Sequence, residues 1–81
     1  MNTVLQVAAF GPLTDVLGSE PLEVSVPLPM TAASLREELI RRFPGLAGHR
    51  FRLAADERLM PEEASIAAAR EIALLPPFAG G

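Results

Sequence analysis

The residues best suited to chemistry in this sequence are Gly80 and Gly81, which end the segment LLPPFAGG. A C-terminal carboxylate is a poor nucleophile and a poor electrophile, so it reacts only after activation. Glycines next to it have no Cβ, so they can pass a narrow channel and adopt φ angles closed to other residues. Pro76 and Pro77 fix their own φ angles and lack backbone donors, which stops sheet pairing and favours an extended course. Residues 77–81 would then reach roughly 17 Å.

The other reactive side chains are isolated from one another in the sequence. His49 is the only histidine and cysteine is absent, so we predict no zinc site and interpret His49 as a surface loop residue. Glu62 and Glu63 are adjacent carboxylates, which we interpret as a solvated loop or a helix start after Pro61. All seven basic residues are arginine. The folded body therefore offers neither a lysine amine nor a thiol to an activated acyl group, and no permanently bound cofactor is expected.

Composition limits the class of protein. The 81 residues predict one domain, and 49 % are hydrophobic, which is enough for one core. The net charge of −3 argues against nucleic acid as the main partner, because binding phosphates needs a basic face. No apolar run approaches the roughly 20 residues of a membrane span, and MNTVLQVAAFG lacks the basic start of a signal peptide. We expect a cytoplasmic protein that binds neither nucleic acid nor membranes.

Hydrophobic periodicity predicts the elements that must position this ending. Strands are expected over residues 3–10, 21–27, 51–55 and 70–75, with a brief LM strand before Pro61. TAASLREELIRRFPG predicts the main helix, with Thr31 as its N-cap. Its buried stripe comprises Ala32, Leu35, Leu39, Ile40 and Phe43. One or two helical turns are expected to close at Gly18, and EEASIAAA predicts another short helical turn.

One main helix cannot cover both faces of a sheet, so these elements predict a two-layer α+β domain. The second face of the sheet would carry Ala8, Phe10, Ala73 and Leu75. An exposed apolar face of this kind usually binds a partner. The alternative is that loops such as residues 61–69 fold over it.

The order of elements and the Gly-Gly ending together resemble the ubiquitin-like β-grasp sulfur carriers. More closely, the chain resembles the MoaD family, the small subunit of molybdopterin synthase, over essentially its whole length. The resemblance rests on the first strand ending in Phe10, the Leu17-Gly18 stop, LREELIRRFP, RLAADERLM and EIALLPPFAGG. It implies a mixed four- to five-stranded sheet packed on one main helix. The β-grasp domain would cover residues 1–76, followed by a flexible tail over residues 77–81.

The resemblance also implies a chemistry for the tail. A MoeB-like enzyme of the ubiquitin-activating type would use ATP to adenylate the carboxylate of Gly81. Sulfur transfer would convert it to a thiocarboxylate, a soft nucleophile that donates sulfur to the pterin precursor of the molybdenum cofactor. Gly80 would enter the partner's active site with Gly81. The protein would not be an enzyme on its own but the sulfur-donating subunit of molybdopterin synthase.

The same resemblance implies a docking surface for a MoaE-like large catalytic subunit, with which the carrier would form a heterotetramer. The residues expected to bind partners are Phe10, Leu59, Leu75, Pro76, Pro77, Phe78 and Ala79. An acidic carrier suits a subunit whose pocket is basic because its substrate is an anionic pterin phosphate.

Three other functions stay open on sequence alone. A carrier of the same kind could serve thiamine, cysteine or tRNA thiolation, because the docking surface decides the acceptor. A ubiquitin-like modifier would form isopeptide bonds through Gly81. A non-covalent β-grasp interaction module would have an incidental Gly-Gly, and only this hypothesis predicts that deleting Gly81 leaves activity intact.

Overall fold

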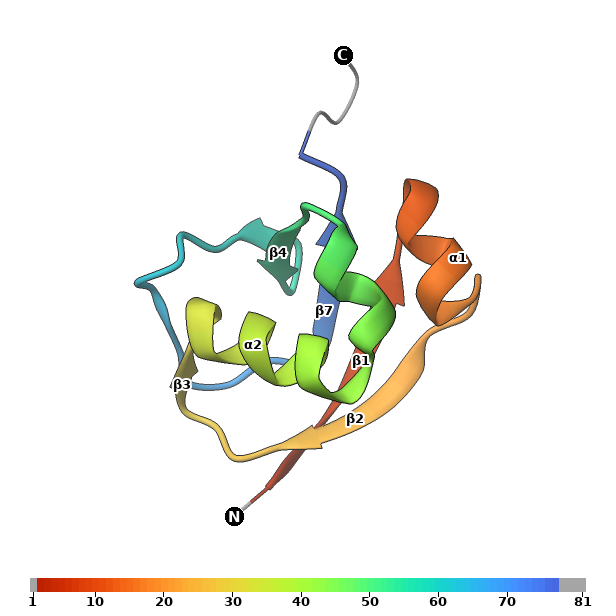
Figure 1. Cartoon of the computed structure of the whole chain (residues 1–81). Coiled ribbons are helices and arrows are strands. Elements are labelled where there is room, and N and C mark those ends of the chain that lie inside the picture. The colour runs from red at the N-terminus through yellow and green to blue at the C-terminus, as the bar shows by residue number, and fades with distance from the viewer. Residues whose placement is uncertain (1, 78–81) are drawn as a thin grey trace.

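The computed structural model describes residues 2–77, which form a five-stranded main sheet with a helix packed across one face (Figure 1). The sheet strands are β1 (Thr3–Ala9), β2 (Leu22–Val26), β4 (Arg52–Ala55), β5 (Arg58–Leu59) and β7 (Glu71–Leu75). A separate ribbon pairs β3 (Met30–Thr31) with β6 (Ser65–Ile66). The helices are α1 (Thr14–Leu17) and α2 (Ala32–Arg42), with 3-10 segments η1 (Gly11–Leu13) and η2 (Pro44–Gly48). The predicted α+β class, with a mixed sheet on one main helix, is confirmed.

The sheet has the order β2-β1-β7-β4-β5. β1 runs antiparallel to β2 and parallel to β7, while β7 runs antiparallel to β4. The last strand therefore lies in the middle of the sheet, between the first strand and β4. Because β7 is the central strand, the chain that follows Leu75 leaves the sheet at the end of its middle strand and not at an edge strand.

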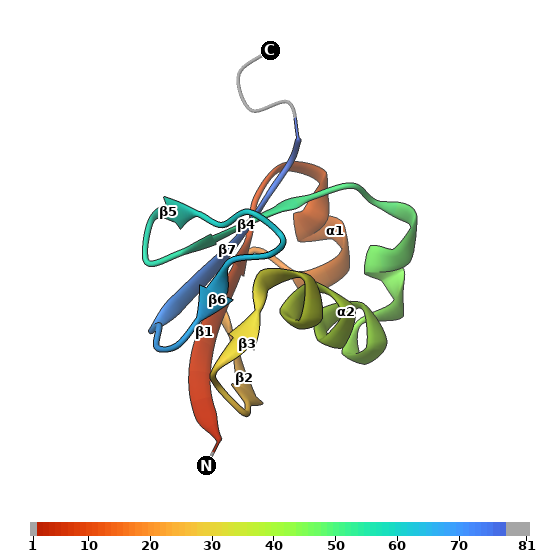
Figure 2. The ribbon, with the colours of Figure 1, turned by 90° about the vertical axis from the view of Figure 1, so that its left-hand side faces the viewer.

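α2 supplies the helical layer, which lies entirely on one side of the sheet (Figure 2). It begins where predicted, because the Thr31 side chain accepts a hydrogen bond from the backbone N–H of Ser34 at 3.1 Å. Leu35 and Leu39 are fully buried against the sheet. The sheet contributes its own inward residues to this core, chiefly Leu5, Val7, Val24, Val26, Leu53, Ile72 and Leu74. The predicted helix stripe is confirmed, because Ala32, Leu35 and Leu39 are buried and Ile40 and Phe43 are partly buried against the same core.

The segment between β5 and β7 differs from the prediction. Instead of a helical turn, Ser65 and Ile66 form β6, which pairs with β3. The carbonyls of Glu62 and Ala64 accept hydrogen bonds from the N–H groups of Ala33 and Ala32, both at 2.9 Å. These N–H groups have no partner inside α2, so the segment caps the helix by its backbone. Ile66 is buried in the core, which favours the strand over a helical turn.

The same contacts decide what covers the second face of the sheet. Residues 61–69 lie against the start of α2 and bury Ile66 and Ala69 in the helix-side core. The alternative in which this loop folds over the opposite face is therefore wrong. On that opposite side, Phe10 and Leu59 are about half exposed. We call this uncovered side of the sheet the open face.

Candidate functional site

The base of the tail is fixed by contacts between the end of β1 and the end of β7. The backbone N–H of Phe10 donates a hydrogen bond to the carbonyl of Leu74 at 3.1 Å. The next residue, Gly11, has a φ angle of 60°, which turns the chain away from the sheet. A Cβ atom at Gly11 would lie 3.2 Å from the Cγ atom of Pro76, so the proline ring packs on the glycine backbone. Pro76 offers no N–H, and the ladder ends at Leu75.

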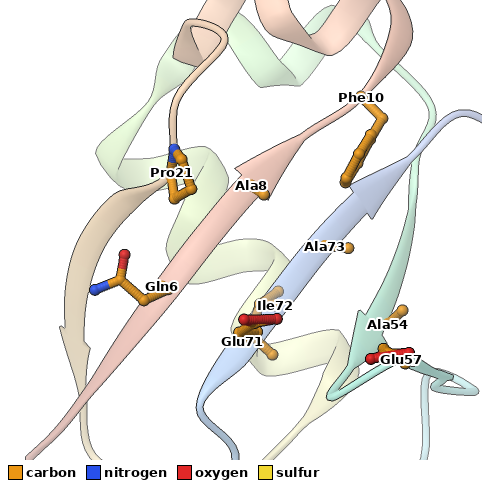
Figure 3. A pocket seen from close by; sticks show the side chains of 9 residues that line it. All are labelled: Gln6, Ala8, Phe10, Pro21, Ala54, Glu57, Glu71, Ile72 and Ala73. Atoms are coloured by element: carbon orange, nitrogen blue, oxygen red, sulfur yellow. The ribbon is translucent and has the colours of Figure 1, made fainter.

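A row of alanines forms the centre of the open face (Figure 3). The register places Ala8 opposite Ala73, and Ala73 opposite Ala54, across β1, β7 and β4. Because three adjacent strands each carry a methyl group here, the surface is hollowed. The hollow has a volume of about 390 Å³. It is lined by Gln6, Ala8, Phe10, Pro21, Ala54, Glu57, Glu71, Ile72 and Ala73.

Large apolar side chains border the hollow toward the tail and at the sheet edges. Phe10 extends from the end of β1 over β7 (Figure 3) and keeps 49 % of its surface exposed. Leu59 pairs with Ala54, so it continues the alanine row at the β5 edge, and it is 48 % exposed. Pro21 closes the row on the β2 side. An apolar floor with an exposed aromatic wall is suited to receive an apolar side chain of a partner.

The opposite end of the hollow is acidic. Glu71 begins β7 and pairs with Gln6, whose side chain donates to the carboxylate of Glu23 at 3.1 Å. Glu57 reaches the same end from the turn between β4 and β5. The hollow therefore joins an apolar end, next to the tail, with a carboxylate-rich end at the start of β7.

Asp56 holds the acidic end in place. Asp56 and Glu57 have φ angles of 47° and 72°, so they form a tight turn between β4 and β5. The carboxylate of Asp56 accepts hydrogen bonds from the backbone N–H groups of Glu71 and Arg70, both at 3.0 Å. These two bonds, first that of Glu71 and then that of Arg70, hold the pKa of Asp56 below its ordinary value. The turn that carries Glu57 is thereby fastened to the strand that carries Glu71.

Three of the residues expected to bind partners lie on the open face. Phe10 directly follows β1, Leu75 ends β7 and Leu59 belongs to β5. Pro76 and Pro77 follow at the base of the tail and are half-buried. Phe78, Ala79, Gly80 and Gly81 lie outside the described residues, so their roles stay predictions.

Sequence reasoning missed the residues that give the face its shape and charge. It did not place Ala54 on this face, and it did not connect Gln6, Pro21, Glu57 or Glu71 with it. Alternation along each strand shows which residues share a face, but the register between distant strands decides which of them touch. Within residues 2–77 no three His, Asp or Glu side chains are close enough to hold a metal ion. None of the helices in this range is long and apolar enough to cross a membrane.

Solved structures with the same fold include proteins from two archaea. Small archaeal modifier protein 1 of Haloferax volcanii shares 21 % identity at a TM-score of 0.76, over 94 % of this chain and 99 % of that one. A candidate molybdopterin converting factor, subunit 1, of Pyrococcus furiosus shares 15 % identity at a TM-score of 0.78, with the same coverage. The HVO 2177 protein of Haloferax volcanii shares 20 % identity at a TM-score of 0.75, over 99 % and 88 %.

The family comparison covers nearly the whole sequence. A comparison with curated protein sequences gave no match. The model of the ThiS family matches residues 7–81, which includes β1 from Val7, the lining of the hollow apart from Gln6, and the Gly-Gly ending. This match confirms the resemblance to the ubiquitin-like sulfur carriers that the sequence indicated. The chain belongs to the ThiS family and has the β-grasp fold of its structural relatives.

Proposed function

We propose that this protein is a cytoplasmic sulfur carrier that acts as the small subunit of molybdopterin synthase. The observation that carries the proposal is the contact between Gly11 and Pro76, which fixes the base of the tail at the end of the central strand. The apolar wall of the open face adjoins that base. A partner that binds the open face would therefore hold the tail at its own active site. Membership of the ThiS family supports the carrier part of this proposal, and the fold shared with the candidate molybdopterin converting factor, subunit 1, of Pyrococcus furiosus favours the molybdopterin pathway.

The proposed chemistry occurs at the carboxylate of Gly81. A carboxylate oxygen attacks the α-phosphorus of ATP on the activating enzyme, and pyrophosphate leaves. A sulfide-equivalent donor then attacks the acyl carbon, AMP leaves, and the product is a thiocarboxylate. Its sulfur is anionic near neutral pH and attacks an electrophilic carbon of the pterin precursor. Gly80 adds no side chain to the arm, so the arm fits a narrow channel.

The body of the protein supplies docking rather than bond making. Phe10, Leu59 and Leu75 offer apolar contacts, and Phe78 with Ala79 extends them along the tail. The large catalytic subunit would bind this surface in a heterotetramer, and the activating enzyme would use it at another time. The net charge of −3 suits a large subunit with a basic pocket for an anionic pterin.

Intact mass spectrometry after co-expression with the native activating enzyme tests the carrier chemistry. We expect the mass gain of one oxygen-to-sulfur exchange, located at Gly81 by fragmentation. The matched control is a chain that lacks Gly81, which should remain unmodified. If the full chain persistently stays unmodified while ATP and the sulfur donor are present, the carrier proposal fails.

The acceptor is tested separately, because the same exchange would occur in a carrier for thiamine, cysteine or tRNA thiolation. Co-purification with the large subunit and conversion of the cyclic pterin precursor by the complex would support the molybdopterin assignment. A Phe78→Ala variant that still assembles and transfers sulfur normally would count against the proposed role of Phe78. A thiocarboxylated protein that neither binds that subunit nor converts the precursor would move the proposal to another acceptor.

The second candidate is a protein modifier, which the fold shared with small archaeal modifier protein 1 favours. It predicts isopeptide conjugates between Gly81 and lysines of other proteins. Because this chain has no lysine, copies of it cannot be joined through their own side-chain amines. Conjugates of many sizes, each heavier than its target protein by the mass of one copy of this chain, would support the modifier function over the synthase-subunit function.

A further inference from the structure

The open face carries opposite charges at its two ends. Arg52 pairs with Leu75, and Ala54 pairs with Ala73, so Arg52 lies one step beyond the alanine row toward the tail. Leu53 is buried in the core, so the alternation of β4 directs exposed Arg52 to the open face. Glu71 lies four residues before Leu75 in the same strand, a separation of about 13 Å. Positive charge therefore adjoins the tail, and negative charge lies at the far end of the hollow.

The charged side chains of the open face form no ion pairs with other side chains in residues 2–77. In the described range, ion pairs join Arg36 to Glu62 and Glu38 to both Arg41 and Arg42. None of the ion pairs in that range involves Arg52, Glu57 or Glu71. A partner can therefore pair with them without first breaking an internal contact.

We propose that the open face is a directional docking surface for a protein that inserts one apolar side chain into the alanine hollow. Beside that side chain the partner presents a basic residue to Glu57 and Glu71, and at the other end an acidic residue to Arg52. The inference rests on the proposed function, because it takes the activating enzyme of the carrier as the partner. It adds to that function a rule for how the partner recognises the chain.

The shape and the charges of the hollow both favour this occupant. Its floor consists of the methyl groups of Ala8, Ala54 and Ala73, which can form no hydrogen bonds. A volume of about 390 Å³ accommodates a whole aliphatic or aromatic side chain. A basic group next to that side chain would meet two carboxylates that take part in no ion pair within residues 2–77.

The charges also explain why the direction of docking matters. An alanine row alone would accept a partner in either of two orientations related by a half-turn. With Arg52 at one end and the glutamates at the other, the reversed orientation brings like charges together, which disfavours it. Because the tail leaves at the Arg52 end, only one orientation directs it into the partner's active site.

Titration of the purified native activating enzyme, without ATP, into the full-length carrier tests this rule. A Glu57→Gln/Glu71→Gln variant should bind about fivefold to tenfold more weakly and show a smaller salt dependence of Kd. The matched control, Glu37→Gln/Glu63→Gln, removes the same charge from exposed sites on α2 and the loop before β6, and should bind like the wild type. Binding of the first variant that equals that of the control would overturn the proposal.

A second pair of variants tests the hollow by volume. Ala73→Leu fills the hollow and should weaken binding by about tenfold or more, whereas Ala47→Leu adds the same atoms to the exposed surface of η2 and should not. Self-association of the wild type through this face, seen by sedimentation and abolished by Ala73→Leu, would overturn the proposal in favour of a second copy.

The orientation rule needs its own variant, Arg52→Glu/Glu71→Arg, which reverses the polarity and keeps the net charge. It should bind more weakly than the Glu57→Gln/Glu71→Gln variant, and equal or tighter binding would contradict the rule.

Oxygen-to-sulfur exchange on the wild type is measured separately, to distinguish the docking rule from the carrier function. If exchange occurs but neither the charge nor the volume variants change Kd, the docking rule fails and the carrier function stands. If the variants change Kd as expected but no exchange occurs, the docking rule stands and the carrier function fails.

Discussion

Gly11 and Pro76 are in contact at the base of the tail, where a Cβ atom at Gly11 would lie 3.2 Å from the Cγ atom of Pro76. The glycine also has a φ angle of 60°, a backbone conformation that residues with a side chain rarely adopt. A side chain at position 11 would therefore be crowded by Pro76, and the proline ring would have to shift by a few tenths of an ångström. The position of the tail depends on this glycine.

Gly11→Ala should therefore destabilise the fold and displace the tail. We expect a loss of about 1–2 kcal/mol in the free energy of unfolding, measured by urea denaturation, from the left-handed conformation alone. Gly48→Ala is the control, because no atom lies within 4 Å of its Cβ position and its φ angle is not positive. Sulfur transfer should fall in the first variant and not in the second. Equal unfolding free energies for the two would show that the contact carries no strain.

Asp56 should make the stability of the protein depend on pH. Its folded-state pKa lies below the ordinary value of 3.8, chiefly because the backbone N–H of Glu71 bonds to its carboxylate. The stabilisation is therefore present above that value and is lost as the pH falls through the folded-state pKa. Asp56→Asn keeps a side-chain oxygen and tolerates the left-handed turn, but it carries no charge.

We expect Asp56→Asn to be less stable than the wild type at pH 7, with the difference shrinking below about pH 4. Urea denaturation at a series of pH values measures this difference. Glu38, whose pKa is lowered first by its hydrogen bond to Arg41 and then by that to Arg42, titrates in both proteins and cancels. Asp15→Asn removes a charge from an exposed site on α1 and should follow the wild type. A difference between Asp56→Asn and the wild type that is constant with pH would contradict the assigned cause.

Much of this fold depends on local sequence. The Thr31 cap, the stripe that contains Leu35 and Leu39, and the alternation of β7 each depend on residues close together in the chain. β6 was not predictable in this way, because Ser65 and Ile66 form only two residues of strand among alanines and need β3 as a partner. Its stability comes from a contact between residues more than thirty positions apart.

The candidate site was likewise predictable only in part from local sequence. The apolar character of Phe10 and Leu75 was visible in the alternation of their strands. The hollow was not, because it exists only when Ala8, Ala73 and Ala54 are brought into register across three strands. Each alanine alone is an ordinary strand residue, and the sequence does not state which strand lies between the other two.

Ile66 tests whether the segment between β5 and β7 belongs to the core. Its side chain is 2 % exposed and packs with the residues beneath α2. Ile66→Ala should reduce the free energy of unfolding by about 2–5 kcal/mol, because it leaves a cavity. Ala67→Ser, one residue further on an exposed side chain, should change stability by less than about 0.5 kcal/mol. An effect of Ile66→Ala as small as that of Ala67→Ser would contradict the core position of Ile66.

Substitutions at Phe10 and Val4 distinguish a specific docking contact beside the hollow from a general contribution of exposed apolar residues on the sheet. Both are exposed apolar residues, Phe10 at 49 % just after β1 and Val4 at 56 % near its start, but only Phe10 lines the hollow. Phe10→Ala should cost about 1 kcal/mol or less in stability, because half of the ring is already in water. If the ring anchors a partner at the base of the tail, the same variant should weaken binding of the activating enzyme by about 30-fold. Val4→Ala should leave that affinity within about twofold, since Val4 lies beyond the point where β7 begins to pair with β1. Comparable losses at both positions would mean that partners contact β1 along its whole length rather than at the tail-side wall of the hollow.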